Sequence, residues 1–350
     1  MKMRRGIFAL VLASLVTASS ARADAVSDFY KDKQIKVVVG YGTGGGYDVY
    51  ARQLARHLGR HVPGSPSVIV QNMPGAGSLR AANYIYSVAP KDGTAIGTFS
   101  RNMPLMGIVG NNENVQYDAR KFTWLGSSSS YANDAYMMFI RADAPFKSIE
   151  DLRRKDGPTL VLGGTAEGAT GNDIPVILRD ALGLNLKLIT GYPDGNAIFL
   201  AVDRGEVQGR TVGLSAVQST HDEWLKPGVM RILVQFGRAT RLAQFADVPT
   251  ARELAPTEAT RALIELAELP YTLARPYAAP PHIPVDRAKA LQAAFLAVHK
   301  DPQYLDEAKK LKIDVSPIDG EAVVAALDQI TGAPPDVLDY IGKLLANAKD

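Results

Sequence analysis

The 350-residue chain carries 39 Lys and Arg against 36 Asp and Glu, a net charge of +3, and it contains no cysteine. The lack of cysteine excludes disulfides, thiolate metal sites and cysteine nucleophiles. The near balance of charge gives no electrostatic support for binding nucleic acid, and we expect no nucleic-acid partner.

The first 23 residues have the layout of a secretory signal peptide. Three basic residues precede an apolar run from 7 to 16, and a small-residue segment ends at Ala23. The run is too short for a stable membrane span, so we expect export to the periplasm with cleavage after Ala23, with Ala25 as the alternative. Without this segment 35 basic residues face 36 acidic ones, a net charge of −1.

Strand and helix patterns alternate through the first third of the chain. Apolar strands are predicted at 35–39, 68–70 and 94–100, and helical patterns at 47–58 and 81–88 separate them. Repeated strand–helix–strand units with short polar turns favour a mostly parallel sheet that helices cover on both faces.

The alternation continues in the middle of the chain, and the part from Val285 onward is rich in helical patterns. Further elements are predicted as strands at 160–162, 186–190, 207–212 and 230–236 and as helices at 174–182, 197–204 and 215–225. Two α/β lobes explain this pattern most simply, with the chain passing from one lobe to the other near 124–126 and again near 236–237. We therefore expect a first lobe formed by 24–126 and 236–350 and a second lobe formed by 127–235.

A glycine-rich turn follows the first strand. The segment 40–48, GYGTGGGYD, contains the motif GxGxxG between a predicted strand and a predicted helix. The same motif occurs in dinucleotide-binding folds. Such a fold needs an acidic residue about 20 positions further on to bind the ribose, and residues 49–91 contain no Asp or Glu. We therefore expect no nucleotide and no other cofactor.

The same turn suits a different anion. Converging backbone N–H groups and the N-terminus of the following helix attract carboxylates as readily as phosphates. Thr43 adds a hydroxyl, and Tyr41 and Tyr47 add aromatic faces with polar tips. A tight structural turn without a ligand is the alternative.

Several motifs, taken in order, resemble one family. The segments VVVGYGTGGGYDVYARQLARHL and VIVQNMPGAGSLRAANYIYSVAPKDGTAIG are similar to the N-terminal signature of the receptors of tripartite tricarboxylate transporters, the Bug-type periplasmic binding proteins. The similarity continues at 164–170, 192–207 and 247–250. Together these segments cover most of the mature chain, and their order and spacing make the resemblance specific.

The resemblance implies a fold and a mechanism. It implies a type II periplasmic-binding-protein fold of Venus-flytrap architecture, with two α/β lobes that each hold a mixed, mostly parallel sheet flanked by helices. Family receptors close over a carboxylate, held largely by backbone amides, hydroxyls and ordered water, and pass it to a membrane permease. We therefore expect a monomeric, non-enzymatic receptor for a di- or tricarboxylic or aromatic organic acid, with the membrane subunits of such a transporter as partners.

The candidate ligand-binding residues come from both lobes. We expect thirteen of them: Tyr41, Thr43, Gly44, Gly45, Tyr47, Ser100, Arg101, Asn102, Ser127, Thr165, Thr170, Tyr192 and Arg210. By the resemblance, the residues of the first turn cradle one carboxylate and residues 100–102 line the same lobe. Thr165 and Thr170 close over the ligand from the second lobe, with Tyr192 nearby.

Two arginines occupy positions where the family more often has uncharged residues. We expect Arg101 or Arg210 to pair with a ligand carboxylate, because a guanidinium offers bidentate geometry. Pairing of Arg210 with Glu206 or Glu167 is the alternative. The tyrosines of the first turn favour a larger or aromatic acid, or else they are half-buried packing residues.

Other chemistry finds little support. His57 and His61 have i,i+4 spacing but no third ligand beside them, so no metal site is expected. The motifs GxSxG, SxxK and HExxH are absent. Two alternatives to a transport receptor remain: a ligand-sensing periplasmic protein that feeds a signalling receptor, and an exported α/β enzyme, which the missing catalytic set disfavours.

Overall fold

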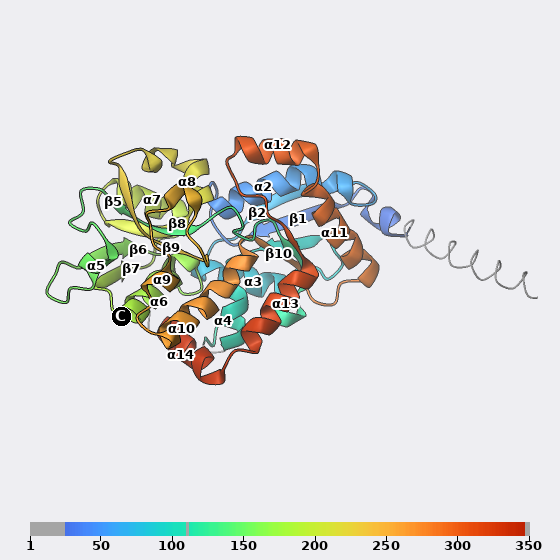
Figure 1. Ribbon diagram of the computed structural model, residues 1–350. Helices are drawn as coiled ribbons and strands as arrows, with labels where there is room; N and C mark the ends of the chain where they lie inside the picture. Colours follow the sequence, from blue (N-terminus) through green and yellow to red (C-terminus); the bar gives the residue numbers. More distant parts are fainter. Residues whose placement is uncertain (1–24, 110–111, 347–350) are drawn as a thin grey trace, which may run out of the picture.

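The computed structural model describes residues 25–109 and 112–346, so the predicted signal peptide lies outside the described residues. Two separate sheets, each packed between helices, form two lobes that lie side by side (Figure 1). Within the described ranges, no helix combines the length and the apolar character needed to cross a membrane.

The first sheet has six strands in the order β11-β4-β10-β3-β1-β2. Its strands are β1 (Gln34–Val39), β2 (Ser67–Asn72), β3 (Ala95–Thr98), β4 (Thr123–Ser127), β10 (Pro276–Ala279) and β11 (Ile318–Asp319). Val37 and Val39 of β1 belong to the apolar core on one face of the sheet, and Val38 belongs to the core on the other face. Because helices cover both faces, Val37, Val38 and Val39 form a buried apolar run, which Lys36 separates from the buried Ile35.

Helices pack on both faces of this first sheet. They are α2 (Gly46–Leu58), α3 (Leu79–Ser87), α4 (Met103–Val109), α11 (Val285–Val298), α12 (Pro302–Lys310) and α13 (Gly320–Thr331). The core on one face joins Leu54 of α2 to Leu291 of α11, and the core on the other joins Ile85 of α3 to Leu327 of α13. The C-terminal part of the chain thus completes the first lobe.

The second sheet has five strands in the order β7-β6-β8-β5-β9. Its strands are β5 (Tyr136–Arg141), β6 (Leu160–Gly163), β7 (Leu186–Ile189), β8 (Gly209–Gly213) and β9 (Met230–Phe236). The remaining helices are α5 (Ile149–Leu152), α6 (Thr170–Leu182), α7 (Gly195–Asp203), α8 (Leu214–Thr220), α9 (Ala251–Leu254), α10 (Glu258–Glu268) and α14 (Pro335–Ala346).

Both sheets are mixed, but the prediction of mostly parallel pairing is wrong. Of the nine strand pairings found among the described residues, four are parallel and five are antiparallel. Every antiparallel pairing involves β5, β10 or β11. The strands β5 and β10 enter their sheets from the other lobe instead of through a strand–helix–strand unit, so nothing forces them to run parallel.

The helices α9 and α10 fall within the segment 236–350 that the sequence analysis assigned to the first lobe. In the structure Leu263 and Ile264 of α10 share an apolar core with Ile174 and Leu178 of α6. This part of the segment therefore packs against the second lobe. The helix α10 buries its apolar face against α6. The chain returns to the first sheet only after this helix.

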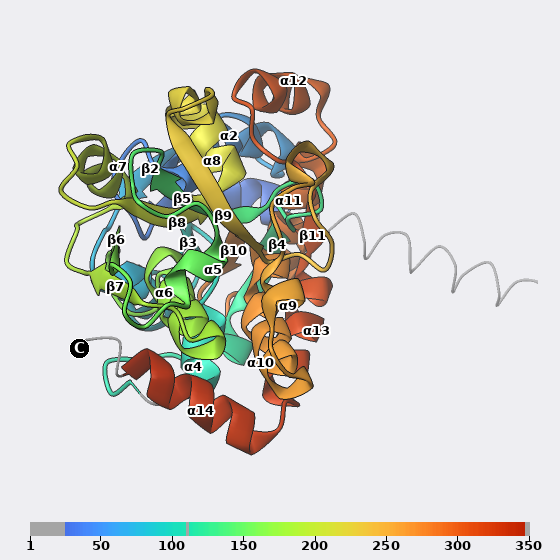
Figure 2. The same ribbon diagram turned by 60° about the vertical axis from the view of Figure 1, so that its left-hand side comes forward.

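Hydrogen bonds join the two lobes directly. Asn102 Nδ2 donates to Asp173 Oδ2 at 2.8 Å, and Ser100 Oγ donates to the carbonyl oxygen of Gly168 at 2.6 Å. The helix α14 also contacts both lobes, because it packs against α4 and against α6 (Figure 2). The structure is therefore a closed arrangement of the lobes.

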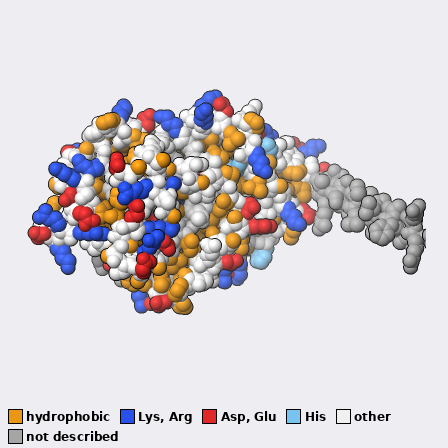
Figure 3. All heavy atoms as spheres, viewed as in Figure 1, with side chains coloured by type: hydrophobic (Ala, Val, Ile, Leu, Met, Phe, Trp, Pro, Cys, Tyr) orange, Lys and Arg blue, Asp and Glu red, His pale blue; other side chains and the backbone are white. Residues whose placement is uncertain are grey.

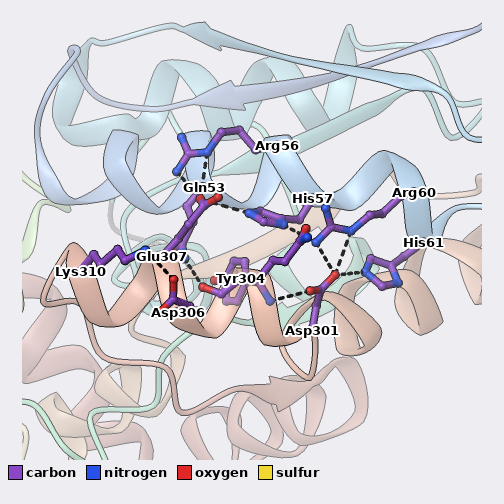
Figure 4. Close-up of polar contacts among 11 residues, drawn as sticks. Gln53, Arg56, His57, Arg60, His61, Asp301, Tyr304, Asp306, Glu307 and Lys310 are labelled. Atoms are coloured by element: carbon purple, nitrogen blue, oxygen red, sulfur yellow. Dashed lines mark hydrogen bonds and ion pairs between the residues drawn. The ribbon is translucent and has the colours of Figure 1, made fainter.

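Ion pairs join α2 and the 3-10 turn that follows it (Gly59–His61) to α12 and its N-cap residue Asp301, along a contact that we call the α2–α12 seam (Figure 4). They join four basic residues to two carboxylates: Arg56 and His57 to Glu307, and Arg60 and His61 to Asp301. The two histidines at i,i+4 spacing thus contact different carboxylates. Within 25–109 and 112–346, no three His, Asp or Glu side chains are placed to hold a metal ion.

Candidate functional site

A cavity of about 90 Å³ lies between the two lobes. On the side of the first lobe its wall is formed by the turn before α2 and by residues that flank β3 and β10. On the side of the second lobe it is formed by β8 and by the first residues of α6 and α7. The cavity thus lies where the sequence analysis expected a ligand cleft.

Seven of the thirteen candidate residues line this cavity: Tyr41, Gly45, Tyr47, Arg101, Thr165, Thr170 and Arg210. They come from segments far apart in the sequence, and lobe closure brings them together. Their contact with a ligand stays a prediction.

The other six candidates, Thr43, Gly44, Ser100, Asn102, Ser127 and Tyr192, lie outside the cavity wall. Ser100 and Asn102 form the hydrogen bonds between the lobes described above, and the carbonyl oxygen of Thr43 accepts a further one from Asn196 Nδ2 at 2.8 Å. Gly44 N donates to Asp48 Oδ2 at 2.8 Å, within the first turn. Thr43, Ser100 and Asn102 thus contribute to the contact between the lobes, whereas the bond of Gly44 stabilises the first turn.

Ser127 and Tyr192 contribute from a second layer. Ser127 Oγ accepts a hydrogen bond from the backbone N of Arg275 at 2.9 Å, so it positions the residue that precedes β10. Tyr192 lines a neighbouring hollow, together with Tyr41, Thr165 and residues 75–78.

Two long helices begin at the cavity. Gly45 and Ala169, the N-cap residues of α2 and α6, both line the wall, and neither provides a side-chain cap. The first backbone N–H groups of each 13-residue helix and the positive end of its dipole therefore face this region. The acidic residues of the two first turns, Asp48 and Asp173, do not line the cavity.

Three arginine side chains line the cavity and are almost completely buried. Arg101, Arg210 and Arg275 are 1 %, 6 % and 3 % exposed. Among the described residues, none of the three forms an ion pair with an Asp or Glu side chain. Burial of cations without a counter-charge is unfavourable, so this arrangement strongly favours an incoming anion.

Arg101 and Arg275 flank the ring of Tyr47. Their Cζ atoms lie 6.0 and 4.8 Å from its centroid, and Arg101 N donates to Tyr47 Oη at 3.1 Å. Burial raises the pKa of Tyr47, but the charges of Arg101 and Arg275 outweigh burial and lower the pKa below its usual value of 10. The cause of this direction is the positive charge of the two guanidinium groups beside the ring.

Arg210 projects from β8 on the side of the second lobe. Its Nη1 donates to the carbonyl oxygen of Gly195, the first residue of α7, at 2.5 Å, and its Cζ lies 4.3 Å from the ring centroid of Phe199. Burial lowers the pKa of Arg210 to about 10, so the guanidinium stays protonated at neutral pH. Among the described residues Arg210 forms no ion pair with Glu206, which contacts Arg204 at 3.9 Å, or with Glu167.

The sequence analysis missed Arg275, Tyr136 and Asp194, which also line the cavity. Asp194 caps α7 by accepting a hydrogen bond from Ala197 N at 3.0 Å, and it provides the one carboxyl group of the lining in the described structure. The Asp-Gly pair at a predicted helix start was a local signal for Asp194. Arg275 and Tyr136 stand next to or within apolar strand sequences, which carry no such signal.

The charged groups of the lining are thus three guanidinium groups and one carboxyl group. Guanidinium groups bind and orient anions but do not deprotonate at neutral pH, so they are poor general bases. The cavity is therefore suited to holding a small anion.

Comparisons with known proteins agree with this geometry. A family profile described as tripartite tricarboxylate transporter family receptor matches residues 50–325. A UPF0065 protein from the gbd 5′ region of Cupriavidus necator is 27% identical over 254 residues, which make up 72% of each chain.

Solved structures show the same fold. The periplasmic binding protein BugD matches with a TM-score of 0.70 at 21% identity, over 90% of this chain and 98% of BugD. MatC from Rhodopseudomonas palustris, solved with bound malate, matches with a TM-score of 0.65 at 18% identity, over 87% of this chain and 99% of MatC. The predicted periplasmic-binding-protein fold is confirmed. Because the profile spans most of the sequence, the chain belongs to the tripartite tricarboxylate transporter receptor family.

Proposed function

We propose that this protein is a periplasmic receptor that captures a small organic acid between its lobes and delivers it, without chemical turnover, to the membrane subunits of a tripartite tricarboxylate transporter. The cavity is the observation that carries the proposal. Three buried guanidinium groups and two helix N-termini line the cavity, and among the described residues of the lining there is one carboxyl group. An acid anion supplies the missing negative charge.

The size and shape of the cavity favour a small aliphatic acid over an aromatic one. Its volume of about 90 Å³ is smaller than the roughly 150 Å³ of an engineered cavity that holds benzene. The rings of Tyr41 and Tyr47 stack on each other with centroids 4.8 Å apart, so one face of each ring is already covered. Malate, with which MatC was solved, belongs to the class of acid that we propose.

Closure of the lobes is the proposed mechanism. A ligand that contacts Arg101 on the first lobe and Arg210 on the second gains both contacts only when the lobes are closed. The ligand then shifts the equilibrium towards the closed state, which the membrane subunits recognise.

Calorimetry and thermal-shift measurements on the protein from residue 24 onward test the binding step. Small aliphatic acids, aromatic acids, sugars and amines are compared at matched concentrations. A ligand at 100 times its Kd should stabilise the protein by about 2.7 kcal/mol, and we expect this response from a small aliphatic acid. A response to sugars or amines alone would contradict the proposal.

Reconstitution tests delivery. Uptake of the bound acid into proteoliposomes that contain the membrane subunits should depend on the receptor. If the liganded receptor instead co-purifies with a sensor kinase and supports no uptake, its role is in signalling. Release of a chemically altered acid would show turnover and would contradict the non-enzymatic part of the proposal.

A further inference from the structure

We infer that Met103 and Met106 form an oxidation-sensitive contact between the lobes. A peroxide converts their thioethers to sulfoxides while the lobes are apart, and the sulfoxides then prevent closure. The inference goes beyond the proposed function, from which it takes only the movement of the lobes. It starts from the packing of one glycine of the second lobe against two methionine side chains of the first.

Met103 and Met106 lie three positions apart in α4. Their side chains are 0 % and 3 % exposed, and both belong to an apolar core of the first lobe. From the second lobe they are met by Gly168, in the loop before α6. A Cβ on Gly168 would stand 2.4 Å from the Cε atom of each methionine and 3.2 Å from Met106 Sδ. The thioether ends therefore lie directly against the backbone of the other lobe.

The backbone of Gly168 is held in place on both sides. Its N donates to Asp173 Oδ1 at 2.9 Å, and its carbonyl oxygen accepts a hydrogen bond from Ser100 Oγ at 2.6 Å. Its φ of +83° lies in the left-handed region that favours glycine. The loop therefore has little freedom to move away from the methionines, and a change at either sulfur has to be taken up by the contact between the lobes.

The position of the lobes controls access to the two sulfur atoms. Because Gly168 belongs to the second lobe, separation of the lobes uncovers the thioether ends that it covers in the closed arrangement. The chain contains no cysteine, so its methionines provide the sulfur atoms that a peroxide can oxidise. The closed arrangement thus protects these two methionines, and the open one exposes them.

The chemical step needs hydrogen peroxide and no other reactant. A sulfur lone pair attacks one peroxide oxygen, the S–O bond forms and the O–O bond breaks. The sulfur loses two electrons, and the departing hydroxide takes the proton of the transferred oxygen and leaves as water. The sulfoxide is larger and more polar than the thioether. Against Gly168 it has neither the space nor a hydrogen-bond donor to satisfy it, so closure becomes unfavourable.

A disulfide across the cavity provides a closed reference without any ligand. A Cβ on Gly42 would lie 3.2 Å from Asp194 Cβ on the second lobe, close to the roughly 3.5–4.5 Å found in disulfides. Gly42→Cys/Asp194→Cys should therefore form a disulfide that holds the lobes closed. The natural chain has no cysteine that could pair wrongly with either position.

Peroxide mapping compares the wild-type protein with this locked variant, and mass spectrometry of peptides measures each sulfoxide. Met103 and Met106 should oxidise at least about tenfold faster in the wild-type protein. Met230, half-buried at the start of β9, should react equally in both proteins, and the buried Met137 and Met138 of β5 should react slowly in both.

Equal oxidation rates of Met103 and Met106 in the two proteins would overturn the inference. Small-angle scattering on the same samples separates this result from a failure of the proposed function. If the wild-type protein without ligand has a larger radius of gyration than the locked variant, the lobes move and the inference alone is wrong. If the radii are equal, the proposed lobe movement fails, and the inference falls with it.

The same cysteine pair measures the effect of oxidation on closure. Its disulfide equilibrium in glutathione buffers reports how readily the lobes close. Addition of Met103→Gln/Met106→Gln, whose amides imitate the polar sulfoxides, should lower this equilibrium by at least about tenfold. Addition of Met103→Leu/Met106→Leu, the apolar control of similar volume, should change it by less than about threefold.

Equal closure of the Gln and Leu variants would show that polarity at the contact does not prevent closure, and the inference would be wrong. Melting temperatures show whether each variant is folded. If the double Gln variant does not fold, Met106→Gln alone is compared with Met106→Leu, because Met106 Sδ lies 3.2 Å from the Cβ position of Gly168.

Discussion

The arginines of the cavity and those of the α2–α12 seam meet opposite surroundings. In the seam Arg56 and Arg60 are half exposed, and each pairs with a carboxylate that also contacts a histidine (Figure 4). In the cavity Arg101 and Arg275 are buried, and no ion pair within the described structure includes them. The same side chain thus serves two purposes, and its environment decides which one.

The seam resembles the outer surface, where basic and acidic side chains lie next to one another over much of the second lobe (Figure 3). Such pairs are satisfied within the protein and hold elements together. The cavity lacks matched carboxylates, so its charges are satisfied only by something that enters. The contrast separates arginines that maintain the fold from arginines reserved for a ligand.

The largest expected effect is a loss of ligand affinity when two arginines of the cavity are replaced. Arg101→Gln combined with Arg275→Gln removes both cations beside the Tyr47 ring, and the affinity for the bound acid should fall by more than about 100-fold. Calorimetry measures the change. The seam variant Arg56→Gln/Arg60→Gln should leave the affinity within about twofold, and a comparable loss in both variants would contradict the distinction.

The next effect concerns two aspartates with opposite pKa shifts. Asp173 is buried at the contact between the lobes, and burial raises its pKa to about 7. Hydrogen bonds from His61 and Arg60 lower the pKa of Asp301 in the seam. A raised pKa gives stability that is present below about pH 4 and is lost as the pH rises through 7. A lowered pKa gives stability that is present above about pH 4 and is lost on acidification.

Unfolding curves between about pH 3 and pH 8 test this pair. Relative to Asp173→Asn, the wild-type protein should lose stability as the pH rises from 4 to 7, by an amount on the order of 2 kcal/mol. Relative to Asp301→Asn, it should lose stability as the pH falls below 4. The same sign for both differences would show that burial does not govern Asp173.

A smaller effect comes from Gly42, in the turn between β1 and α2. A Cβ at this position would lie 2.1 Å from Asp194 Oδ2, and Asp194 is held in place by its bond to Ala197 N. Gly42→Ala should therefore hinder closure and weaken ligand binding by about tenfold, with little change in stability without ligand. Small-angle scattering should show a smaller decrease in radius of gyration on ligand addition.

Gly42→Ala/Asp194→Ala is the matched control for this experiment. It keeps the methyl group at position 42 but removes the carboxyl group that the methyl group would meet. The control should recover part of the closure that Gly42→Ala loses. A control that closes as poorly as Gly42→Ala would show that the contact with Asp194 does not limit closure.

The smallest expected effect is on the melting temperature, which should respond differently to loss of Arg60 in the seam and loss of Arg101 in the cavity. Arg60→Gln should lower the melting temperature by at most a few degrees, because partly exposed ion pairs contribute little, and about 0.5 M salt should reduce the difference. Arg101→Met should leave the melting temperature of the unliganded protein unchanged or higher, because it removes a buried charge without an ionic partner. Differential scanning calorimetry measures both variants. A clear decrease for Arg101→Met would show that its aromatic contacts compensate the charge fully.

Local sequence patterns predicted the strands that lie between helices. In β1, Ile35 and residues 37–39 are buried, whereas β2 lies at the edge of the sheet and has no fully buried residue. The predicted bounds of both strands differ from the observed ones by one or two residues. The antiparallel strands were harder to predict. The strand β10 has four residues, begins with Pro276 and pairs with strands from an earlier part of the chain, so no local periodicity marks it.

The candidate site was predictable to the extent that its chemistry is local. The glycine turn placed Gly45 and Tyr47 at a helix start, and both line the cavity. Arg275 reaches Tyr47 only through the pairing of β10 with β3 and β4, which the sequence does not display. Ser127 was predicted to line the ligand site, and it instead positions Arg275 through the backbone.

The helix α14 has a thermodynamic consequence for capture of the ligand. Its apolar residues Val337, Leu338 and Ile341 pack into a core shared with α6, while the same helix also lies against α4 of the first lobe. Separation of the lobes must expose part of this apolar surface to solvent, and closure must bury it again. Ligand capture should therefore be accompanied by a negative change in heat capacity that exceeds the burial of the ligand alone. The C-terminal helix thereby couples capture of a small polar ligand to the burial of apolar surface away from the cavity lining.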